Sequence, residues 1–200
     1  MHGYWLKGFT SLYDIITIKL NAHVISGEVS PWMTKERTCL IVKDESKGAL
    51  VSNFRPITCL RIMWKLLTGI IGAELYNHLE GKKLLPEEQK GCRRKSRGTK
   101  DQLMIDKMIL KNCKRKLTNL NLAWIGYKKA YDMVPHSWII ECLEIFKVSQ
   151  NITTLIRNSM KNWRVELTSM GQKLGEVNIR RGIFQGDSLS PILFVMALIP

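Results

Sequence analysis

The chain of 200 residues has few of the side chains that cross-link a fold. Its five cysteines are an odd number, and none of them form a Cys-x-x-Cys pair. The four histidines do not combine with the cysteines at the spacing of zinc ligands. We therefore expect neither a disulfide framework nor a structural zinc, and we expect scattered core thiols in a reducing compartment.

Long hydrophobic runs are also missing. The longest run, residues 192–199, is too short for a membrane-spanning helix, which needs about 20 apolar residues. The N-terminus lacks a basic region followed by an apolar core, so no signal peptide is predicted. Because the apolar run extends almost to Pro200 without a polar cap, the sequence indicates a piece of a longer protein.

Acidic residues are scarce, since 17 Asp and Glu stand against 31 Lys and Arg and leave a net charge of +14. Residues 82–116 alone hold 13 basic and 4 acidic residues, a net charge of +9. Such an excess favours a polyanionic partner, either nucleic acid or an anionic membrane surface. A basic protein without such a partner is the alternative.

The local patterns predict a mixture of helices and short strands. Apolar periodicity and terminal residues predict helices over residues 10–26, 62–79, 99–116, 137–146 and 151–162, and from residues 188–191 onward. Strands are predicted over residues 38–42, 121–125, 163–168 and 176–180, the last two as a hairpin. Arg55 must be extended because a proline follows it. With a hydrophobic fraction of 45%, the mixture favours one folded α+β or α/β domain.

The predicted helix over residues 99–116 carries two patterns. Its start, Thr-Lys-Asp-Gln, matches a capping box. An apolar face is expected to be buried, and its residues are Leu103, Met104, Met108 and Leu110. A basic stripe at helical spacing consists of Lys107, Lys111 and Lys114. A solvated helix face is the simpler interpretation of the stripe, but a neighbouring basic loop favours contact with phosphates. That loop contains Arg93, Arg94, Lys95 and Arg97.

Three segments stand out by their order and separation. The first joins Lys43 to the run Ser-Asn-Phe-Arg-Pro-Ile at residues 52–57. The second is Trp-Ile-Gly-Tyr-Lys-Lys-Ala-Tyr-Asp at residues 124–132, and the third is Arg-Gly-Ile-Phe-Gln-Gly-Asp-Ser-Leu-Ser-Pro at residues 181–191. Together they closely resemble the reverse transcriptase domain of non-LTR (LINE-type) retrotransposons. The resemblance covers nearly the whole chain from about residue 31.

This resemblance implies a right-hand polymerase of the α+β class. It implies an N-terminal helical extension over residues 1–30, a fingers-like region over residues 31–118 and a partial palm over residues 119–200. The fold is expected to stop before the second catalytic carboxylate hairpin and the thumb. The implied partners are an RNA template, a DNA primer and a deoxynucleoside triphosphate, with no membrane, in a nuclear or cytoplasmic location.

The chemistry implied by the resemblance is attack of a primer 3′-hydroxyl on the α-phosphate of the nucleotide. Two Mg²⁺ ions held by carboxylates assist this reaction in the family. The position of the family's first metal-binding aspartate is Gly126 here, and the Ala-Asp-Asp hairpin would follow the last helix. Asp132 is expected to be a local cap or turn residue instead of a replacement. We therefore do not expect this chain to hold Mg²⁺ or to polymerise DNA alone.

The remaining positions match the family and imply nucleotide contacts. Lys43 and Arg55 would clamp the triphosphate, although Lys43 read alone is also an ordinary loop lysine. Tyr131 would exclude a 2′-hydroxyl beside the sugar, or it is a plain core aromatic. The other residues implied to contact the nucleotide and template are Tyr127, Gln185 and Gly186.

Two features of the third segment have a structural interpretation. Asp187 is expected to be a carboxylate at a helix N-terminus instead of a metal ligand. Leu189 and Pro191 are expected to start the helix beneath the Gln-Gly turn. A non-catalytic RNA- or DNA-binding remnant and a decayed open reading frame stay open as alternative functions.

Overall fold

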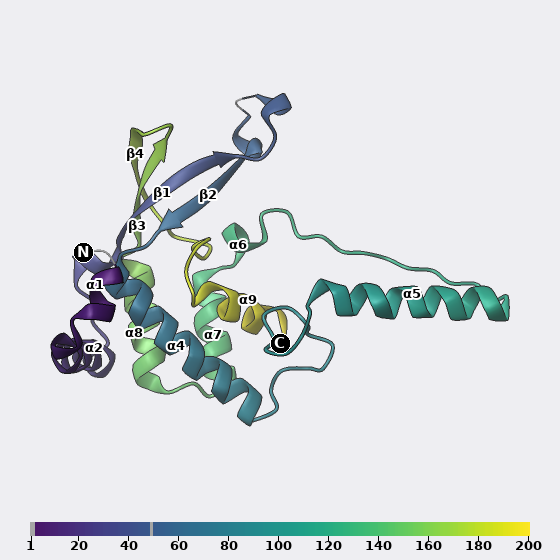
Figure 1. Ribbon diagram of the computed structural model, residues 1–200, viewed down its shortest axis with the longest axis horizontal. Helices are drawn as coiled ribbons and strands as arrows, with labels where there is room; N and C mark the ends of the chain where they lie inside the picture. The colour runs from purple at the N-terminus through teal and green to yellow at the C-terminus, as the bar shows by residue number, and fades with distance from the viewer. Residues whose placement is uncertain (1–2, 49) are drawn as a thin grey trace.

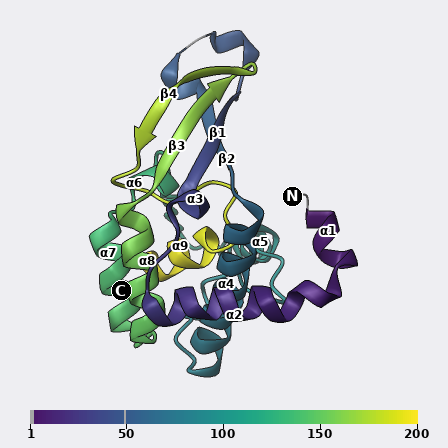
Figure 2. The ribbon, with the colours of Figure 1, turned by 90° about the vertical axis from the view of Figure 1, so that its left-hand side faces the viewer.

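A computed structural model describes residues 3–48 and 50–200 of the chain. A small mixed sheet stands on one end of a helical body, and one helix projects from that body (Figures 1 and 2). The sheet has the order β2-β1-β3-β4. The expected combination of helices and strands in one fold is therefore confirmed. Among the described residues, no helix is both long enough and apolar enough to cross a membrane.

The sheet brings together strands that are far apart in the sequence. Strand β1 (Lys35–Val42) pairs antiparallel with β2 (Phe54–Cys59) and parallel with β3 (Arg164–Ser169). Strand β4 (Gln172–Asn178) completes the predicted hairpin with β3. Both predicted regions, residues 31–118 and 119–200, thus contribute strands to one sheet, and their division into fingers and palm stays a prediction.

The extended conformation expected at Arg55 is confirmed, because Arg55 and Pro56 lie within β2. Pro56 has no N–H to donate, and β2 is an edge strand where one missing donor is tolerated. The sheet is buried on only part of its surface: Thr38 and Val165 point into the core while Ile41 is exposed. Strand β1 is therefore less buried than its apolar sequence predicted.

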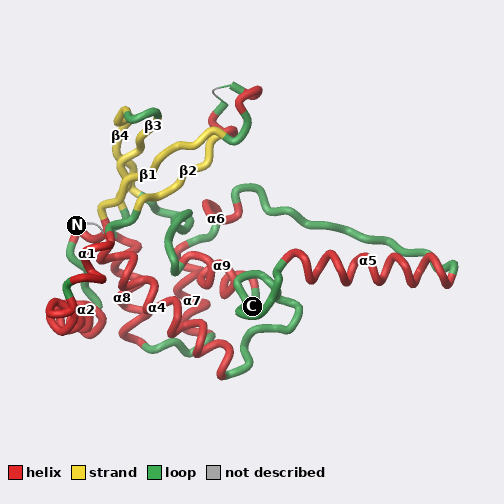
Figure 3. Tube along the Cα trace, in the orientation of Figure 1, coloured by secondary structure: helices red, strands yellow, loops and turns green. Residues whose placement is uncertain are grey.

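The helical body is held by a core of leucines. Helix α4 (Ile62–Gly81) packs beside α7 (His136–Ile145), α8 (Gln150–Lys161) and α9 (Ser190–Leu198), as Figure 3 shows. Almost fully buried leucines from these helices form its centre: Leu67, Leu79, Leu143, Leu155 and Leu193. The four helices were predicted from the sequence, with Pro191 in the first turn of α9.

An N-terminal helix closes the far side of the body. Helix α2 (Tyr13–Ser26) ends at Gly27, whose φ of +69° suits glycine, as the sequence predicted. A Cβ atom at Gly27 would lie 2.7 Å from Cγ2 of Thr154 in α8, and Asn158 donates a hydrogen bond to the Gly27 carbonyl at 2.8 Å. The short elements are α1 (Gly3–Gly8), η1 (Thr10–Leu12), α3 (Pro31–Thr34), η2 (Glu45–Lys47), η3 (Val51–Asn53) and α6 (Ala130–Met133).

Helix α5 (Thr99–Lys116) forms an arm that extends away from the body (Figure 1). The expectation of a buried apolar face is wrong, because none of its residues is buried and Met108 is 69% exposed. The misjudged residues are Leu103, Met104, Met108 and Leu110. The apolar spacing was correct for a helix, but no other described element covers that face.

The predicted capping box is wrong too. The cap position is Gly98, one residue before Thr99, and no side chain caps the helix there. Instead, the Asp101 carboxylate accepts hydrogen bonds from the Arg97 N–H at 2.9 Å and the Ser96 hydroxyl at 3.1 Å. Asp101 thus fixes the preceding loop by reaching back along the chain.

Residues 118–127 return from the tip of α5 without forming the strand predicted over residues 121–125. Trp124 is 76% exposed and Ile125 is 83% exposed. A strand needs a neighbour to satisfy its backbone donors and acceptors. No described strand pairs with this segment, because both edges of the sheet lie elsewhere.

Candidate functional site

The Arg-Gly-Ile-Phe-Gln-Gly segment lies between the sheet and the turn that contains α6. The N–H of Thr58 in β2 donates to the Gln185 carbonyl at 2.8 Å. On the other side, the N–H of Ile183 donates to the Tyr131 carbonyl at 3.0 Å, and the N–H of Gly182 donates to the Val134 carbonyl at 2.8 Å. Backbone hydrogen bonds therefore bring the three sequence segments into contact.

Two glycines make this close packing possible. A Cβ atom at Gly182, where φ is +88°, would lie 2.9 Å from both the Tyr131 carbonyl oxygen and Cα of Asp132. A Cβ atom at Gly186, where φ is +122°, would lie 2.6 Å from the Thr58 carbonyl oxygen. Both the backbone conformation and the space thus require glycine. The expected close approach at Gly186 is made here to β2.

The three segments line one cavity of about 720 Å³. Its residues from the first segment include Lys43 and Arg55, and those from the second are Lys129 and Asp132. Gln185 from the third segment completes this wall. The resemblance predicted Lys43, Arg55 and Gln185 as site residues, but it gave Asp132 a local turn role and did not include Lys129. Lys129 itself has a left-handed backbone conformation (φ +51°) at the position just before α6. Nothing in the sequence predicts that conformation.

The cavity has an excess of positive charge. Lys43, Arg55 and Lys129 face a single carboxylate, Asp132. None of these three cations forms an ion pair with a described residue. Lys43 instead donates a hydrogen bond to the Ser52 carbonyl at 2.9 Å, which positions its ammonium group. Cations without internal partners are suited to an anionic ligand such as a phosphate.

Tyr131 lines a second hollow, of about 650 Å³, which shares Lys129 and Gln185 with the first cavity. Gln185 and Gly186 also line it, together with Lys65. One part of the Tyr131 ring packs on Phe194, with 4.9 Å between ring centroids, and burial raises the pKa of its hydroxyl. Tyr131 is thus partly a core aromatic and partly a wall of the hollow. Tyr127 is exposed and lines neither cavity.

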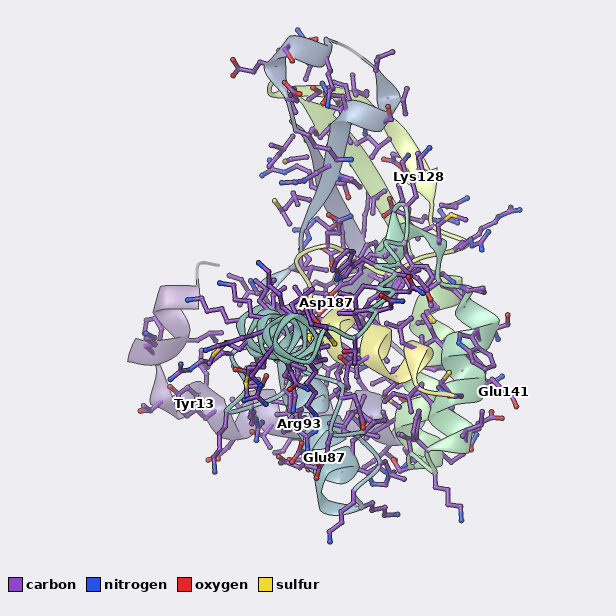
Figure 4. The ribbon with its side chains drawn as sticks, turned by 90° about the vertical axis from the view of Figure 1, so that its right-hand side faces the viewer. Tyr13, Glu87, Arg93, Lys128, Glu141 and Asp187 are labelled. Atoms are coloured by element: carbon purple, nitrogen blue, oxygen red, sulfur yellow. The ribbon has the colours of Figure 1, made fainter. Side chains whose placement is uncertain are left out.

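Asp187 lies inside the junction between sheet and helices (Figure 4). Its Oδ1 atom accepts a hydrogen bond from the Leu189 N–H at 3.1 Å, just before α9 begins. Burial raises the pKa of this carboxyl, and hydrogen bonds from Thr68 and from the backbone oppose that effect. In this position the carboxylate faces the N-terminal turn of α9.

Gly126 is the position that the sequence resemblance assigns to a metal-binding aspartate, and glycine offers no side chain there. It lies in the exposed return segment, and a Cβ atom there would have nothing within 4 Å. Within residues 3–48 and 50–200, no three His, Cys, Asp or Glu side chains stand close enough together to hold a metal ion. The residues present around Gly126 therefore do not fit a Mg²⁺ site, since a hard cation needs several oxygen ligands.

The basic loop and the arm divide the remaining cations into two groups. Arg93 pairs with Glu80 at 3.3 Å, and the Arg94 guanidinium lies 4.4 Å above the Tyr76 ring. These two arginines fasten the loop to α4. The other cations predicted to contact phosphates are all exposed, and they are Lys95 and Arg97 in the loop and Lys107, Lys111 and Lys114 on α5. The spacing of the three lysines places them on one side of the arm.

Comparison with known proteins shows what these features have in common. The family model described as "Reverse transcriptase (RNA-dependent DNA polymerase)" matches residues 41–199. The chain is 33% identical over 176 residues to a Pol polyprotein of the R2 retrotransposable element of Popillia japonica, covering 86% of this chain and 24% of that protein. It is 25% identical over 193 residues to a Pol polyprotein of the R2 element of Nasonia vitripennis, covering 96% of this chain and 18% of that protein.

A third relative is the Pol polyprotein of the R2DM element of Drosophila melanogaster, which is 24% identical over 150 residues. That match covers 73% of this chain and 13% of the relative, so the chain spans about a quarter or less of each of these proteins. The family match takes in all three segments that meet at the cavity. The chain therefore belongs to the reverse transcriptase family of non-LTR retrotransposons.

Proposed function

We propose that this chain binds a nucleoside triphosphate and a nucleic-acid template for an R2-like reverse transcriptase, and that it does so without polymerising DNA itself. The observation that carries the proposal is the cavity in which three distant segments place Lys43, Arg55 and Lys129 without ion-pair partners. Three cations and one carboxylate leave a net charge of +2, which suits a triphosphate. The R2 relatives support the assignment to this class of element.

In this proposal, each cavity residue has a distinct contact with the nucleotide. Arg55 and Lys43 bind phosphate oxygens, because a guanidinium grips two oxygens at once and an ammonium acts as a point charge. Gln185 and Gly186 lie along the base pair. Tyr131, on the adjoining hollow, packs beside the sugar and leaves no space for a 2′-hydroxyl. Tyr127, which is exposed, contacts the nucleotide only if the return segment moves toward the cavity.

The arm and the basic loop bind the template in this proposal. Lys107, Lys111 and Lys114 contact successive phosphates along one side of α5, and Lys95 and Arg97 extend this surface toward the body. Arg93 and Arg94 contribute mainly by holding the loop in place, because their guanidinium groups already contact α4. Such phosphate contacts are independent of sequence and weaken as salt increases.

In this proposal the chain does not polymerise DNA, because Gly126 supplies no carboxylate to hold a metal ion. The family uses divalent metal ions to stabilise charge on the phosphates during nucleotidyl transfer. The side chains described here bind and orient the nucleotide, but they provide no group that would hold such an ion beside it. Asp132 lines the cavity and is the carboxylate closest in sequence, but one carboxylate does not supply the several oxygen ligands that Mg²⁺ needs.

Nucleotide binding is tested by titrating a fluorescent deoxynucleoside triphosphate into the purified chain. We expect the double variant with Lys43→Ala and Arg55→Ala to bind at least about tenfold more weakly, because two charge-assisted contacts are lost. Lys19→Ala is the matched control, since Lys19 is an exposed lysine on α2. Equal affinity of the double variant and the control would overturn the assignment of the cavity.

The absence of polymerisation is tested with the same preparation on a primed RNA template. We expect no extension of the primer, and detectable extension would refute that part of the proposal. Gly126→Asp has no steric obstacle, because nothing lies within 4 Å of the added Cβ atom. Its effect on Mg²⁺-dependent triphosphate binding then measures what the missing carboxylate contributes.

A further inference from the structure

Two cysteines lie side by side on the sheet, away from the cavity. Cys39 in β1 pairs with Ile57 in β2, and Arg37, two residues before Cys39, pairs with Cys59. Side chains two residues apart on a strand point to the same face. Cys39 and Cys59 are therefore diagonal neighbours on one face of the sheet, and the Cys59 thiol is close enough to lower the pKa of Cys39.

The surroundings of Cys39 favour its thiolate form. The Thr168 hydroxyl of β3 lies 3.4 Å from Sγ of Cys39 and 3.4 Å from the Thr38 carbonyl oxygen, and its single proton is donated to one or the other. The hydrogen bond from Thr168 to the sulfur lowers the pKa of the Cys39 thiol, desolvation opposes it, and the nearby Cys59 thiol and the positive charge of Arg37 lower the pKa further. A thiolate is the reactive form of cysteine, so Cys39 is poised to act as a nucleophile.

The other thiols provide a contrast within the same chain. Cys142 is buried in α7, where burial raises the pKa of its thiol to about 11. Cys92 is exposed in the basic loop, yet desolvation raises the pKa of its thiol as well. Cys59 is exposed and Cys39 is half-buried, so solvent reaches the pair. Only this pair, among the described cysteines, combines a lowered thiol pKa with a second thiol on the neighbouring strand.

We propose that Cys39 and Cys59 form a peroxide-sensitive dithiol that closes reversibly into a disulfide between β1 and β2. The Cys39 thiolate attacks one oxygen of hydrogen peroxide, the O–O bond breaks, and uptake of one proton releases water and leaves a sulfenic acid. The Cys59 sulfur then attacks the Cys39 sulfur, the S–O bond breaks, and the departing oxygen takes the Cys59 proton to leave as water. Two thiols thus lose two electrons, and peroxide is reduced to two waters.

The register of the strands indicates how stable the bond is. Diagonal neighbours in an antiparallel pair have Cα atoms about 7–8 Å apart. A disulfide usually needs Cα atoms within about 4.4–6.8 Å. Closing the bond therefore draws the end of β2 toward β1, and the resulting strain makes the disulfide easy to reduce. A strained, accessible disulfide of this kind forms under oxidative stress and is reopened in a reducing compartment.

Peptide mapping tests the proposal directly. The purified chain is exposed briefly to hydrogen peroxide, free thiols are alkylated, and trypsin is added. Cys39 then lies in the peptide of residues 38–43, and Cys59 lies in that of residues 48–61 because trypsin does not cut between Arg55 and Pro56. We expect these two peptides to be joined with the loss of two hydrogens, and to separate after reduction.

Control variants distinguish this pair from general oxidation. We expect Cys39 to react with peroxide at least about tenfold faster than Cys92. The variant Cys92→Ser should leave the reaction rate of Cys39 unchanged. Cys59→Ser keeps the strand and should leave Cys39 as a sulfenic acid that a dicarbonyl probe captures. In chains unfolded in urea, Cys39 should no longer react faster than the other cysteines. Faster oxidation of Cys92 or Cys113, or linkage of Cys39 to any cysteine other than Cys59, would overturn the proposal.

Discussion

The junction between sheet and helices and the arm differ in what holds them in place. At the junction, buried leucines, glycines in left-handed or unusual conformations, and backbone hydrogen bonds fix residues from distant segments. In the arm, α5 has no buried residue, and its contact with the body is made by the loop before it. Packing therefore determines the geometry of the cavity, whereas charge determines what the arm can bind.

The largest expected effect on this contrast comes from removing a core side chain. Leu143 in α7 is fully buried, so Leu143→Ala should lower the free energy of unfolding by about 3–5 kcal/mol. Met108→Ala in α5 should change it by less than about 0.5 kcal/mol, because Met108 is exposed. Urea denaturation of the two variants measures both values. A large loss for Met108→Ala would show that the arm packs against the body in solution.

The next effect in size concerns the glycines of the junction. Gly182→Ala places a Cβ atom 2.9 Å from backbone atoms at a φ of +88°, and we expect a loss of about 3 kcal/mol. Gly126→Ala is the matched control, because its Cβ atom would have open space around it. Thermal unfolding followed by circular dichroism compares them. If both variants unfolded at the same temperature as the parent chain, Gly182 would not lie against Tyr131 and Asp132.

The sequence predicted the helices of the body better than the junction. Residues 62–79 were recognised as a helix within two residues of the ends of α4, because one long apolar stretch without proline suffices for that. The parallel pairing of β1 with β3 was not predictable, since it joins residues about 130 apart that share no local signal. Gly182 belongs to the third sequence segment, but its tight contact with Asp132 was not predictable, because that contact exists only in the folded chain.

In the arm, the sequence predicted the helix correctly but its burial wrongly. The pattern of α5 was read correctly as a helix, but its apolar residues predicted burial that the chain does not supply. Residues 121–125 have the composition of a buried strand and yet lie in an unpaired, exposed segment. Periodicity gives the local conformation, whereas burial depends on a neighbour that composition does not identify. Of the site, Lys43, Arg55 and Gln185 were reached by resemblance, and Lys129 was not.

An effect of similar size on the free energy of unfolding is expected from the buried carboxylate of Glu36, which lies where the sheet meets α4. Glu36 is 2% exposed and accepts a hydrogen bond from the Arg61 N–H at 2.9 Å. Burial raises the pKa of Glu36 to about 7, and the charge of Asp187 adds to this while Arg61 opposes it. The folded chain thus binds a proton more readily than the unfolded chain, so stability is highest at low pH and falls as pH rises through 4.5–7.

Glu36→Gln removes this dependence because it cannot ionise. At about pH 8 we expect the variant to be more stable than the parent by roughly 3 kcal/mol, with the difference vanishing near pH 4. Asp101, at the base of the arm, has a pKa lowered first by the Arg97 N–H, so its contribution has the opposite sign and is lost as pH falls. Denaturation midpoints measured at about pH 8 should therefore shift upward for Glu36→Gln and downward for Asp101→Asn, and the Asp101→Asn shift should disappear only as pH falls below about 3.8.

The smallest effect on folding, and the sharpest on binding, is expected from the lysines of the arm. Replacing Lys107, Lys111 and Lys114 together by glutamine keeps good helix formers in α5, so the unfolding transition should stay unchanged. The triple variant should bind a single-stranded RNA more weakly, and the slope of log affinity against log salt should fall in magnitude by about 2, since each lost phosphate contact contributes about 0.7.

The matched control for this charge change replaces Lys7, Lys19 and Lys147, three exposed lysines outside the arm, by glutamine. Fluorescence anisotropy at several salt concentrations gives the slope for each chain. A general attraction between the +14 chain and RNA would lower both slopes equally, because it depends only on net charge. A loss confined to the arm variant instead requires phosphates to lie along α5, which would make the unpacked helix the binding surface and leave the packed junction to the nucleotide.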